Sequence, residues 1–300
     1  MLARALVAVL ALGACADAPS SPPVDPNDLD GDGIPNDADL CPRTYGDVQH
    51  DEDADGVGDA CDNCPTVANP EQGDTTELDA RNFPDGVGDA CDRRPTLAGD
   101  EIARFFPFAD PSEASAFDGT GWTIGNDQAR ATSTTSAQWT SRKAELGAGL
   151  SLQITIASLV WPAIDDGEVT VALDGAGESS GYRCRIVHET TGDRLVLEEI
   201  GGATASKALA RIGPTSRLVL TISRQFIAPP TGDAACFLAI DGGRETRVDI
   251  TTLDDQSLGT YALGARAADV ALDAATVLTT PTGCITPAGT LGVCPRPPRE

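Results

Sequence analysis

The 300-residue chain has few basic, aromatic and histidine residues. It contains 21 lysines and arginines against 46 aspartates and glutamates, for a formal net charge of −25 at pH 7. This balance argues against a nucleic-acid-binding protein, because contacts to phosphates require basic side chains. With only two histidines, His50 and His188, a histidine-based zinc or haem site is not expected. Hydrophobic residues at 41% still suffice for a folded core.

The negative charge is concentrated before residue 101. Residues 16–100 hold 22 acidic residues, four arginines and no lysine, whereas residues 101–300 hold 24 acidic and 16 basic residues. The length fits roughly two domains. We therefore expect an acidic repeat segment at 28–99, a β domain at 100–280 and a tail at 281–300.

The first 14 residues have the features of a signal peptide. Arg4 precedes a short apolar run, Ala5–Leu12, which is shorter than the roughly 20 residues needed to span a bilayer. No later stretch is long and apolar enough to cross a membrane. The run leads into Leu12-Gly13-Ala14-Cys15, which resembles a bacterial lipobox. That resemblance implies cleavage before Cys15 and lipidation of its thiol.

The residues after Cys15 complete this interpretation. Ala16 resembles the sorting pattern of lipoproteins sent to the outer membrane, so we expect an exported protein of the outer membrane or cell surface. An ordinary secretory peptide cleaved near Ala14 or Ala16 is the alternative. Residues 15–27, rich in Pro and Ser, are expected to form a tether with no fold of its own.

Eight cysteines remain if Cys15 is lipidated. In an oxidising compartment they predict four disulfides, although the sequence alone does not fix the pairing. A zinc site is not expected, because the chain has a single C-x-x-C spacing and the surrounding residues offer oxygen ligands. Proximity along the chain favours the pairs Cys41–Cys61, Cys64–Cys91, Cys184–Cys236 and Cys284–Cys294.

Aspartates recur at a fixed spacing in three stretches, 28–42, 51–65 and 81–95. The first two have Asp at loop positions 1, 3, 5 and 12 and Gly at position 6, which is the spacing of a calcium-binding loop. Ca²⁺ prefers six to eight oxygen ligands, and a carbonyl at position 7 supplies one of them. The expected ligands are Asp28, Asp30, Asp32, the Ile34 carbonyl, Asn36 and Asp39 in the first loop, and Asp51, Asp53, Asp55, the Val57 carbonyl, Asp59 and Asp62 in the second.

The third stretch departs from the pattern. Arg81 and Phe83 stand at positions 1 and 3, and the spacing from the second stretch is 30 residues instead of 23. Glu77 or Asp79 could substitute for the missing carboxylates. We expect a weaker site there or none, with the remaining ligands Asp85, the Val87 carbonyl, Asp89 and Asp92.

These loops are not expected to be EF-hands. Prolines precede the first loop and follow the first two, at Pro42 and Pro65, where EF-hands need helices. Residues 28–95, with Asp62-Asn63-Cys64-Pro65 and Asn69-Pro70-Glu71-Gln72, instead resemble thrombospondin type 3 repeats. The resemblance implies little regular secondary structure, a series of bound Ca²⁺ ions and disulfides between successive repeats. Because the segment has few apolar residues, we expect ions and disulfides to fold it into a stiff stalk.

The residues after Asp100 predict a mainly β domain. Short β-rich runs alternate between apolar and polar residues, as in Leu152–Ile156, Val169–Leu173 and Leu218–Ile222, and no long helical pattern is present. Many short strands favour an antiparallel β-sandwich or jelly roll. Stretches such as Gly121-Trp122-Thr123-Ile124 and Ala235–Gly242 make the domain similar to laminin-G and concanavalin-like jelly rolls.

No catalytic motif is convincing, and we expect no enzyme. Gly177–Gly181 matches G-x-S-x-G, but a strand follows it where a nucleophile elbow needs a helix. The E-x-D-x-x-E motif of jelly-roll glycosidases is absent. Exposed aromatic residues could bind sugars, but core packing is the favoured role for Trp122, Trp139, Trp161, Tyr182 and Tyr261.

The sequence therefore predicts a lipid-anchored, calcium-binding surface protein with a structural or adhesive role. Its partners would be calcium ions and a glycan or surface protein, with membrane contact through the lipid only and no nucleic acid. Three alternatives stay open, namely a carbohydrate-binding lectin-like module, a secreted hydrolase of jelly-roll type, and calcium buffering at the surface.

Overall fold

A computed structural model describes residues 25–46, 48–75, 84–93, 95, 99–146, 149–162, 166–173, 181–228, 231–252 and 258–280. The chain divides into two compact units, Met1–Gln49 and His50–Glu300. The first unit contains the first aspartate-rich loop. The second contains the other two loops together with the β domain, so the boundary expected near residue 100 falls inside it.

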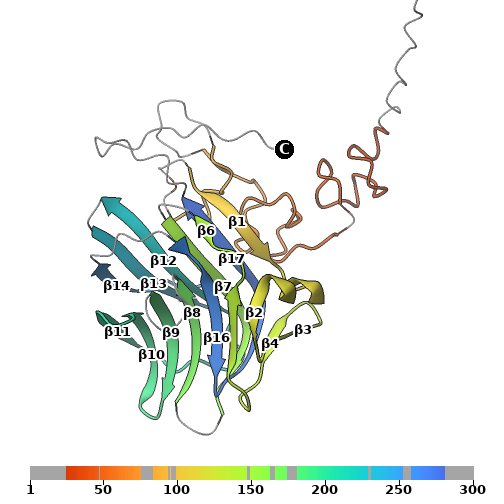
Figure 1. Cartoon of the computed structure of the whole chain (residues 1–300). Helices are drawn as coiled ribbons and strands as arrows, with labels where there is room; N and C mark the ends of the chain where they lie inside the picture. The colour runs from red at the N-terminus through yellow and green to blue at the C-terminus, as the bar shows by residue number, and fades with distance from the viewer. Residues whose placement is uncertain are drawn as a thin grey trace, which may run out of the picture. The chain divides into compact units, whose positions relative to one another are not determined.

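The β domain consists of two antiparallel sheets packed face to face (Figure 1). An eight-stranded sheet has the order β14 (Thr246–Thr252), β13 (Thr231–Ile240), β12 (Leu218–Ala228), β7 (Gly149–Val160), β17 (Asp269–Thr280), β4 (Ala129–Ala131) and β3 (Thr123–Ile124), with β1 (Glu101–Phe106) also paired to β17. A seven-stranded sheet has the order β11 (Thr204–Leu209), β10 (Gly192–Glu199), β9 (Tyr182–Glu189), β8 (Gly167–Leu173), β16 (Tyr261–Arg266), β5 (Ala137–Ser141) and β2 (Phe117–Thr120). The prediction of a mainly β sandwich is confirmed.

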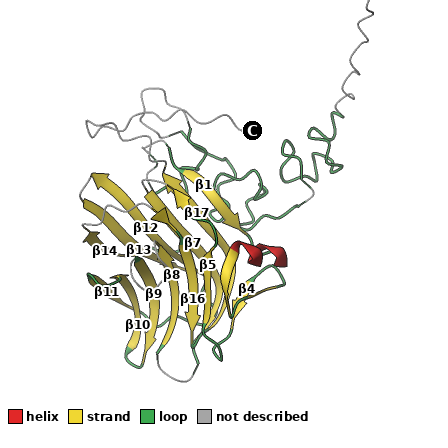
Figure 2. Ribbon diagram, in the orientation of Figure 1, coloured by secondary structure: helices red, strands yellow, loops and turns green. Residues whose placement is uncertain are grey.

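Regular structure outside the two sheets is limited. β15 (Leu258–Gly259) pairs with β6 (Glu145–Leu146), and the described residues contain one short 3₁₀ helix, η1 (Pro111–Ala116), capped by Asp110 (Figure 2). No helix in the described part of the chain has the length and hydrophobicity to cross a membrane.

The core lies between the sheets and follows the period-two pattern of the sequence. Leu152, Ile154 and Ile156 of β7 are at most 1% exposed, and the alternate residues of the facing strand β8 are equally buried. The turn between β13 and β14 also follows the sequence, because Asp241 and Gly242 both adopt positive φ, as a tight hairpin turn requires.

Aromatic residues fill one end of this core. Trp122, Trp139, Tyr182 and Tyr261 are each at most 7% exposed, and the Trp139 ring stacks on Phe117 at a centroid distance of 4.9 Å. The favoured prediction of core packing is therefore confirmed for these four. They offer no exposed surface on which a sugar ring could stack.

The Cys184–Cys236 disulfide joins the two sheets. Cys184 lies on β9 of the seven-stranded sheet and Cys236 on β13 of the eight-stranded sheet, with their Cα atoms 5.5 Å apart. Both residues are fully buried. The bond therefore closes the sandwich through its core.

Candidate calcium-binding repeats

The first two loops hold their carboxylates by the same backbone hydrogen bonds. The Gly33 amide donates to Asp28 Oδ2 at 3.1 Å, and the equivalent Gly56 amide donates to Asp51 Oδ2 at 2.9 Å. Gly33 and Gly56 have φ of 97° and 95°, a conformation that favours glycine. The glycine at position 6 thus turns the chain and fixes the position 1 carboxylate.

The position 5 carboxylates are held at both oxygens. Asp55 Oδ1 accepts from the Val57 amide at 2.8 Å, and its Oδ2 accepts from the Asn69 amide at 2.7 Å, 14 residues downstream. In the first loop Asp32 has the same arrangement with the amides of Ile34 and Gly46. Each loop is therefore closed by the segment that follows it.

A glutamine side chain donates a hydrogen bond to the position 12 aspartate in both loops. Gln72 Nε2 donates to Asp62 Oδ1 at 2.7 Å, while its Oε1 accepts from the Asn63 amide at 2.9 Å. Gln49 makes the same two bonds, to Asp39 and Leu40, in the first loop. This reciprocal clamp was not identified from the sequence, although Gln49 and Gln72 are separated by the 23-residue repeat period.

Several carboxylate oxygens in these loops are buried and have no hydrogen-bond partner among the described residues. They are Oδ2 of Asp30, Asp39, Asp53 and Asp62. Such an arrangement is unfavourable for a carboxylate unless a cation satisfies it. One oxygen from each position 1, 3 and 5 aspartate lies within 4.8 Å of the others, in the groups Asp28, Asp30, Asp32 and Asp51, Asp53, Asp55. The donor set, all oxygen, fits Ca²⁺.

The electrostatics of the loops also favour a cation. Burial raises the pKa of Asp53 to about 6, and the neighbouring charges of Asp55 and Asp62 contribute to that rise. Burial likewise raises the pKa of Asp30, of Asp62 and of Asp85 above the usual range. Without a cation, ionisation of these carboxylates at neutral pH is therefore energetically unfavourable.

The position 9 side chains also make hydrogen bonds within their loops, and their role as calcium ligands stays a prediction. Asn36 Oδ1 accepts from the Leu29 amide at 3.0 Å, and Asp59 Oδ1 accepts from the Glu52 amide at 3.0 Å. Asp59 Oδ2 also lies 2.5 Å from His50 Nδ1. These side chains close the loops across their first residues.

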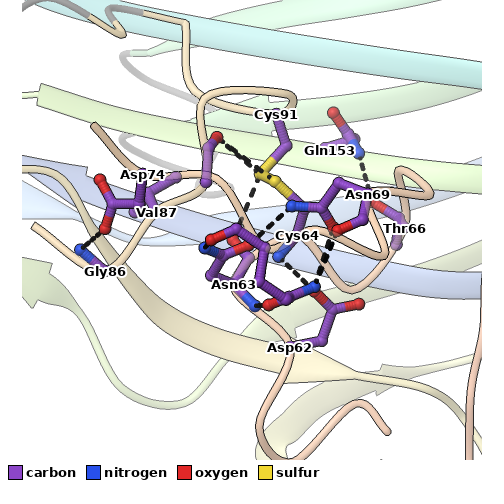
Figure 3. Close-up of a disulfide and its surroundings, with 12 residues drawn as sticks. Asp62, Asn63, Cys64, Thr66, Asn69, Asp74, Gly86, Val87, Cys91 and Gln153 are labelled. Atoms are coloured by element: carbon purple, nitrogen blue, oxygen red, sulfur yellow. Dashed lines mark hydrogen bonds between the residues drawn. A yellow bond between two sulfur atoms is a disulfide. The ribbon is translucent and has the colours of Figure 1, made fainter. Parts of the chain in front are cut away.

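The third loop begins at Asp74, not at Arg81. In all three loops the position 9 amide donates to the carbonyl before position 1, as Asn36 to Asn27, Asp59 to His50 and Asp89 to Gly73, at 2.8 to 2.9 Å. The Gly86 amide donates to Asp74 Oδ2 at 2.8 Å, as the other position 6 glycines do (Figure 3). Asp74 Oδ1 is a further buried oxygen with no hydrogen-bond partner in the described part of the chain.

An insertion explains why the aspartate spacing did not predict Asp74 as the start of the third loop. Asp74 follows Asp51 by 23 residues, the same spacing that separates Asp28 from Asp51. The chain then carries seven extra residues before Asp85, which lengthened the apparent repeat to 30. Arg81, Phe83, Glu77 and Asp79 lie outside the described residues.

The start of the β domain contributes to the third loop. Asp85 Oδ2 accepts from the amides of Gly99 and Asp100, at 2.8 and 2.7 Å, in the position that Asn69 takes in the second loop. Oxygens of Asp85, Asp92 and Asp100 lie within 4.8 Å of one another. Asp100, which the sequence pattern marks only as a domain boundary, is therefore a candidate ligand.

Comparisons with known proteins identify the acidic segment. A family model described as thrombospondin type 3 repeat matches residues 25–45 and 44–72. Residues 25–72 are thrombospondin type 3 repeats. No curated protein matches the sequence significantly. The two matched repeats contain the first two loops, and the third loop follows them with the same hydrogen bonds.

Among solved structures, the chain is similar to a legume lectin-like domain from Entamoeba histolytica, with 11% identity, a TM-score of 0.47 and coverage of 59% of this chain and 96% of that one. It is also similar to the VIP36 exoplasmic/lumenal domain in a Ca²⁺/Man3GlcNAc-bound form, with 8% identity, a TM-score of 0.46 and coverage of 60% and 90%. A CBM2 module of the Lactobacillus casei BL23 phage J-1 evolved Dit matches at 10% identity and a TM-score of 0.44, over 61% and 96%. Likenesses this weak carry no argument about what the sandwich binds.

The second repeat packs on the eight-stranded sheet of its own unit. Gln153 of β7 donates to Thr66 at 2.8 Å, as Figure 3 shows, and Arg217 Nη2 lies 3.1 Å from Glu52 Oε1. Burial, together with the nearby charge of Asp273, raises the pKa of Glu52 to about 7. Polar residues on the outer face of the sheet therefore provide partners for the second repeat.

The residue after the third loop makes a similar contact. Arg93 donates to Thr221 on β12 at 3.3 Å, pairs with Glu245 at 2.8 Å and lies over the Phe237 ring. Thr221 is 2% exposed and also donates to Gln153 of β7 at 3.3 Å. The outer face of the eight-stranded sheet is thus a docking surface for the segment before it.

The cysteines of the repeats are oxidised. Cys64 and Cys91 form a disulfide with Cα atoms 5.6 Å apart, joining the second repeat to the third loop (Figure 3). Cys41 and Cys61 are each disulfide-bonded, and the predicted pairing between them stays a prediction. Cys15 and the expected Cys284–Cys294 pair lie outside the described residues.

The position 7 residues occupy different surroundings. Val87 is fully buried, while Ile34 and Val57 are half-buried. Their carbonyls as calcium ligands stay a prediction.

His188 is the one histidine of the β domain, and three described residues contact its ring. Its Nδ1 lies 2.7 Å from Oδ1 of the buried Asp193, Arg211 lies against the same ring at 3.0 Å, and Trp161 stacks on it. Most of Gly177–Gly181 lies outside the described residues.

Proposed function

We propose that this chain is an exported, calcium-dependent structural or adhesive protein of the cell surface. Its repeats take their fold from bound Ca²⁺, and the second and third loops stiffen the chain directly against the β-sandwich. The proposal is of a non-enzymatic protein that presents the sandwich to a partner.

The buried, unpartnered carboxylate oxygens carry this proposal. Asp30, Asp39, Asp53, Asp62 and Asp74 each have one such oxygen among the described residues, distributed over all three loops. Ca²⁺ supplies the positive charge and the coordination that these oxygens lack. A disordered acidic linker would instead expose its carboxylates to water, where each is fully solvated.

Calorimetric titration of the full chain with Ca²⁺ tests the proposal. We expect three ions per chain in the parent protein and two in an Asp74→Asn variant, because a neutral amide in place of this carboxylate weakens the position 1 ligand of the third loop. Glu71→Gln is the matched control, since Glu71 is exposed and three residues away. Absence of binding by the parent protein would overturn the proposal, and an unchanged ion count in Asp74→Asn would exclude Asp74 as a ligand that the third site requires.

Surface attachment is a separate part of the proposal. The Leu12–Cys15 motif supports a lipid on Cys15, and the disulfides of the chain support an oxidising, extracellular location. We expect the protein expressed in a bacterium to partition into the detergent phase, and a Cys15→Ser variant to partition into the aqueous phase. Recovery of both proteins in the aqueous phase would indicate a secreted protein without a lipid anchor.

A further inference from the structure

The outer face of the seven-stranded sheet has a hollow floored by small residues. Ala262 and Gly264 of β16 lie opposite Ala172 and Thr170 of β8 on this face. None of the four has a long side chain, so a cleft of about 180 Å³ remains over the middle of the sheet. Gln138 of β5 lies beside Gly264 and lines the cleft.

Arginines form the opposite wall and one end of this cleft. Arg183 and Arg185 lie on the neighbouring strand β9, in register with Ala172 and Thr170 of β8. Arg266 of β16 lines the cleft beyond Gly264. Glu168 also lines the cleft, so its charged lining is three arginines and one carboxylate, in a chain whose formal net charge is −25. The repeats before the sandwich carry most of the opposite charge.

The arginines are not equivalent. Arg185 is held by Glu198 at 2.6 Å and Glu168 at 3.3 Å, and Arg266 lies 3.4 Å from Glu168. The Arg183 side chain makes no hydrogen bond or ion pair with any residue in the described part of the chain. Its guanidinium is therefore available at the edge of the hollow, whereas the charge of Arg185 beside it is offset by the two glutamates.

We propose that this cleft binds a single acidic sugar residue, with the carboxylate on Arg183 and the ring over the floor formed by Ala172 and Gly264. A guanidinium recognises a carboxylate through two parallel hydrogen bonds. The Gln138 amide and the Thr170 hydroxyl are suited to sugar hydroxyls, because each can both donate and accept. The volume is below the roughly 300–1,000 Å³ of sites for drug-sized ligands, which fits one ring.

Other anionic ligands fit this cleft less well. An extended acidic peptide is usually recognised at the edge of a sheet, through its backbone, but β8 is paired on both sides, to β9 and β16. A long polyanion would be repelled by the negative charge of the chain as a whole. A small ligand with one carboxylate needs no sheet edge. It is also repelled less by the distant negative charges of the chain, because salt screens charges beyond about 8 Å at physiological ionic strength.

The test is equilibrium binding of D-glucuronate, its neutral parent glucose, acetate and a short poly-aspartate peptide to the full chain. We expect glucuronate to bind at least tenfold more tightly than glucose or acetate, because the site uses the charge and the hydroxyls together. Arg183→Gln should weaken glucuronate binding at least tenfold and remove its preference over glucose. Ala172→Leu, which fills the floor, should abolish binding of the ring.

Arg194→Gln is the matched control, because Arg194 lies on the neighbouring strand β10 and does not line the cleft. Calcium binding and thermal unfolding, unchanged in Arg183→Gln, show that the variant is folded, and they separate this proposal from that of the calcium loops. Equal affinity for glucuronate and glucose, no binding of glucuronate, or full binding by Arg183→Gln would each overturn the proposal. Tighter binding of poly-aspartate than of glucuronate would overturn it in favour of an acidic peptide.

Discussion

Removal of calcium is expected to unfold the first repeat while the β-sandwich stays folded. In the described part of residues 25–49 the buried residues are Asp39 and Cys41, whereas Leu29, Tyr45 and Val48 are 45% to 75% exposed. No apolar core can hold this segment. The sandwich has a continuous core of its own between the two sheets, so we expect it to stay folded without the ions.

Hydrogen exchange with and without a chelator measures this effect. At a calcium concentration of 100 times the dissociation constant, one bound ion stabilises its site by about 2.7 kcal/mol, or about 100-fold in exchange protection. We expect the Gly33 and Ile34 amides, which donate to aspartate side chains, to lose about that factor. Amides of β7 and β12 should be unchanged. Equal protection of the first repeat in both conditions would contradict a metal-dependent fold.

A pair of aspartates in the first loop gives the matched substitutions. Asp39 is 8% exposed and has a buried oxygen without a hydrogen-bond partner among the described residues, whereas Asp37, two residues away, is exposed. Asp39→Asn should reproduce the effect of the chelator in the first repeat, and Asp37→Asn should not. The same loss in both variants would show that total charge, not coordination, holds the loop.

The pH profile distinguishes coordination from simple charge repulsion. In the calcium-free protein the pKa of Asp53 is raised from 3.8 to about 6, so between these values the folded state binds more protons than the unfolded chain. The stability of the calcium-free second repeat therefore falls as the pH rises through this window. The calcium-loaded repeat should show the opposite slope, because its ligands must be deprotonated to bind. Urea unfolding of the repeat at a series of pH values, with calcium and with chelator, measures both slopes.

The period-two patterns were sufficient to predict the central strands. Leu152–Ile156, Val169–Leu173 and Leu218–Ile222 lie within β7, β8 and β12, where one face of each strand is buried. β11 was not predicted, because Thr204–Leu209 is mostly exposed at the edge of its sheet and so has no apolar face to reveal it. β1 was not predicted for a different reason, because most of its residues are half-buried and show no alternation.

The candidate site was predictable as far as the local spacing reached. The Asp-x-Asp-x-Asp-Gly pattern placed the carboxylates of the first two loops correctly in sequence, because a single turn of chain brings them together. Asp74 and Asp100 could not be found this way, since the insertion separates Asp74 from Asp85 and Asp100 belongs to the next domain. The 23-residue period would have located Asp74, but no local pattern contains Asp100.

Loss of the inter-sheet disulfide is expected to destabilise the sandwich strongly. Cys184 and Cys236 are separated by 52 residues, and releasing a loop of that length costs about 4 kcal/mol in the chain-entropy account. That is a large part of the roughly 5–15 kcal/mol that stabilises a typical domain. We expect a Cys184→Ala/Cys236→Ala variant to lower the urea midpoint of the sandwich substantially.

The second disulfide supplies the control for this experiment. Cys64–Cys91 lies outside the sandwich core and joins the second repeat to the third loop. A Cys64→Ser/Cys91→Ser variant should therefore weaken calcium binding in these loops while leaving the sandwich transition largely in place. The Cys184→Ala/Cys236→Ala variant should do the reverse, because its bond ties β9 to β13 and touches no loop carboxylate. Identical urea midpoints in the two variants would mean that the repeats and the sandwich unfold as one cooperative unit, with the sandwich depending on the calcium loops for its stability.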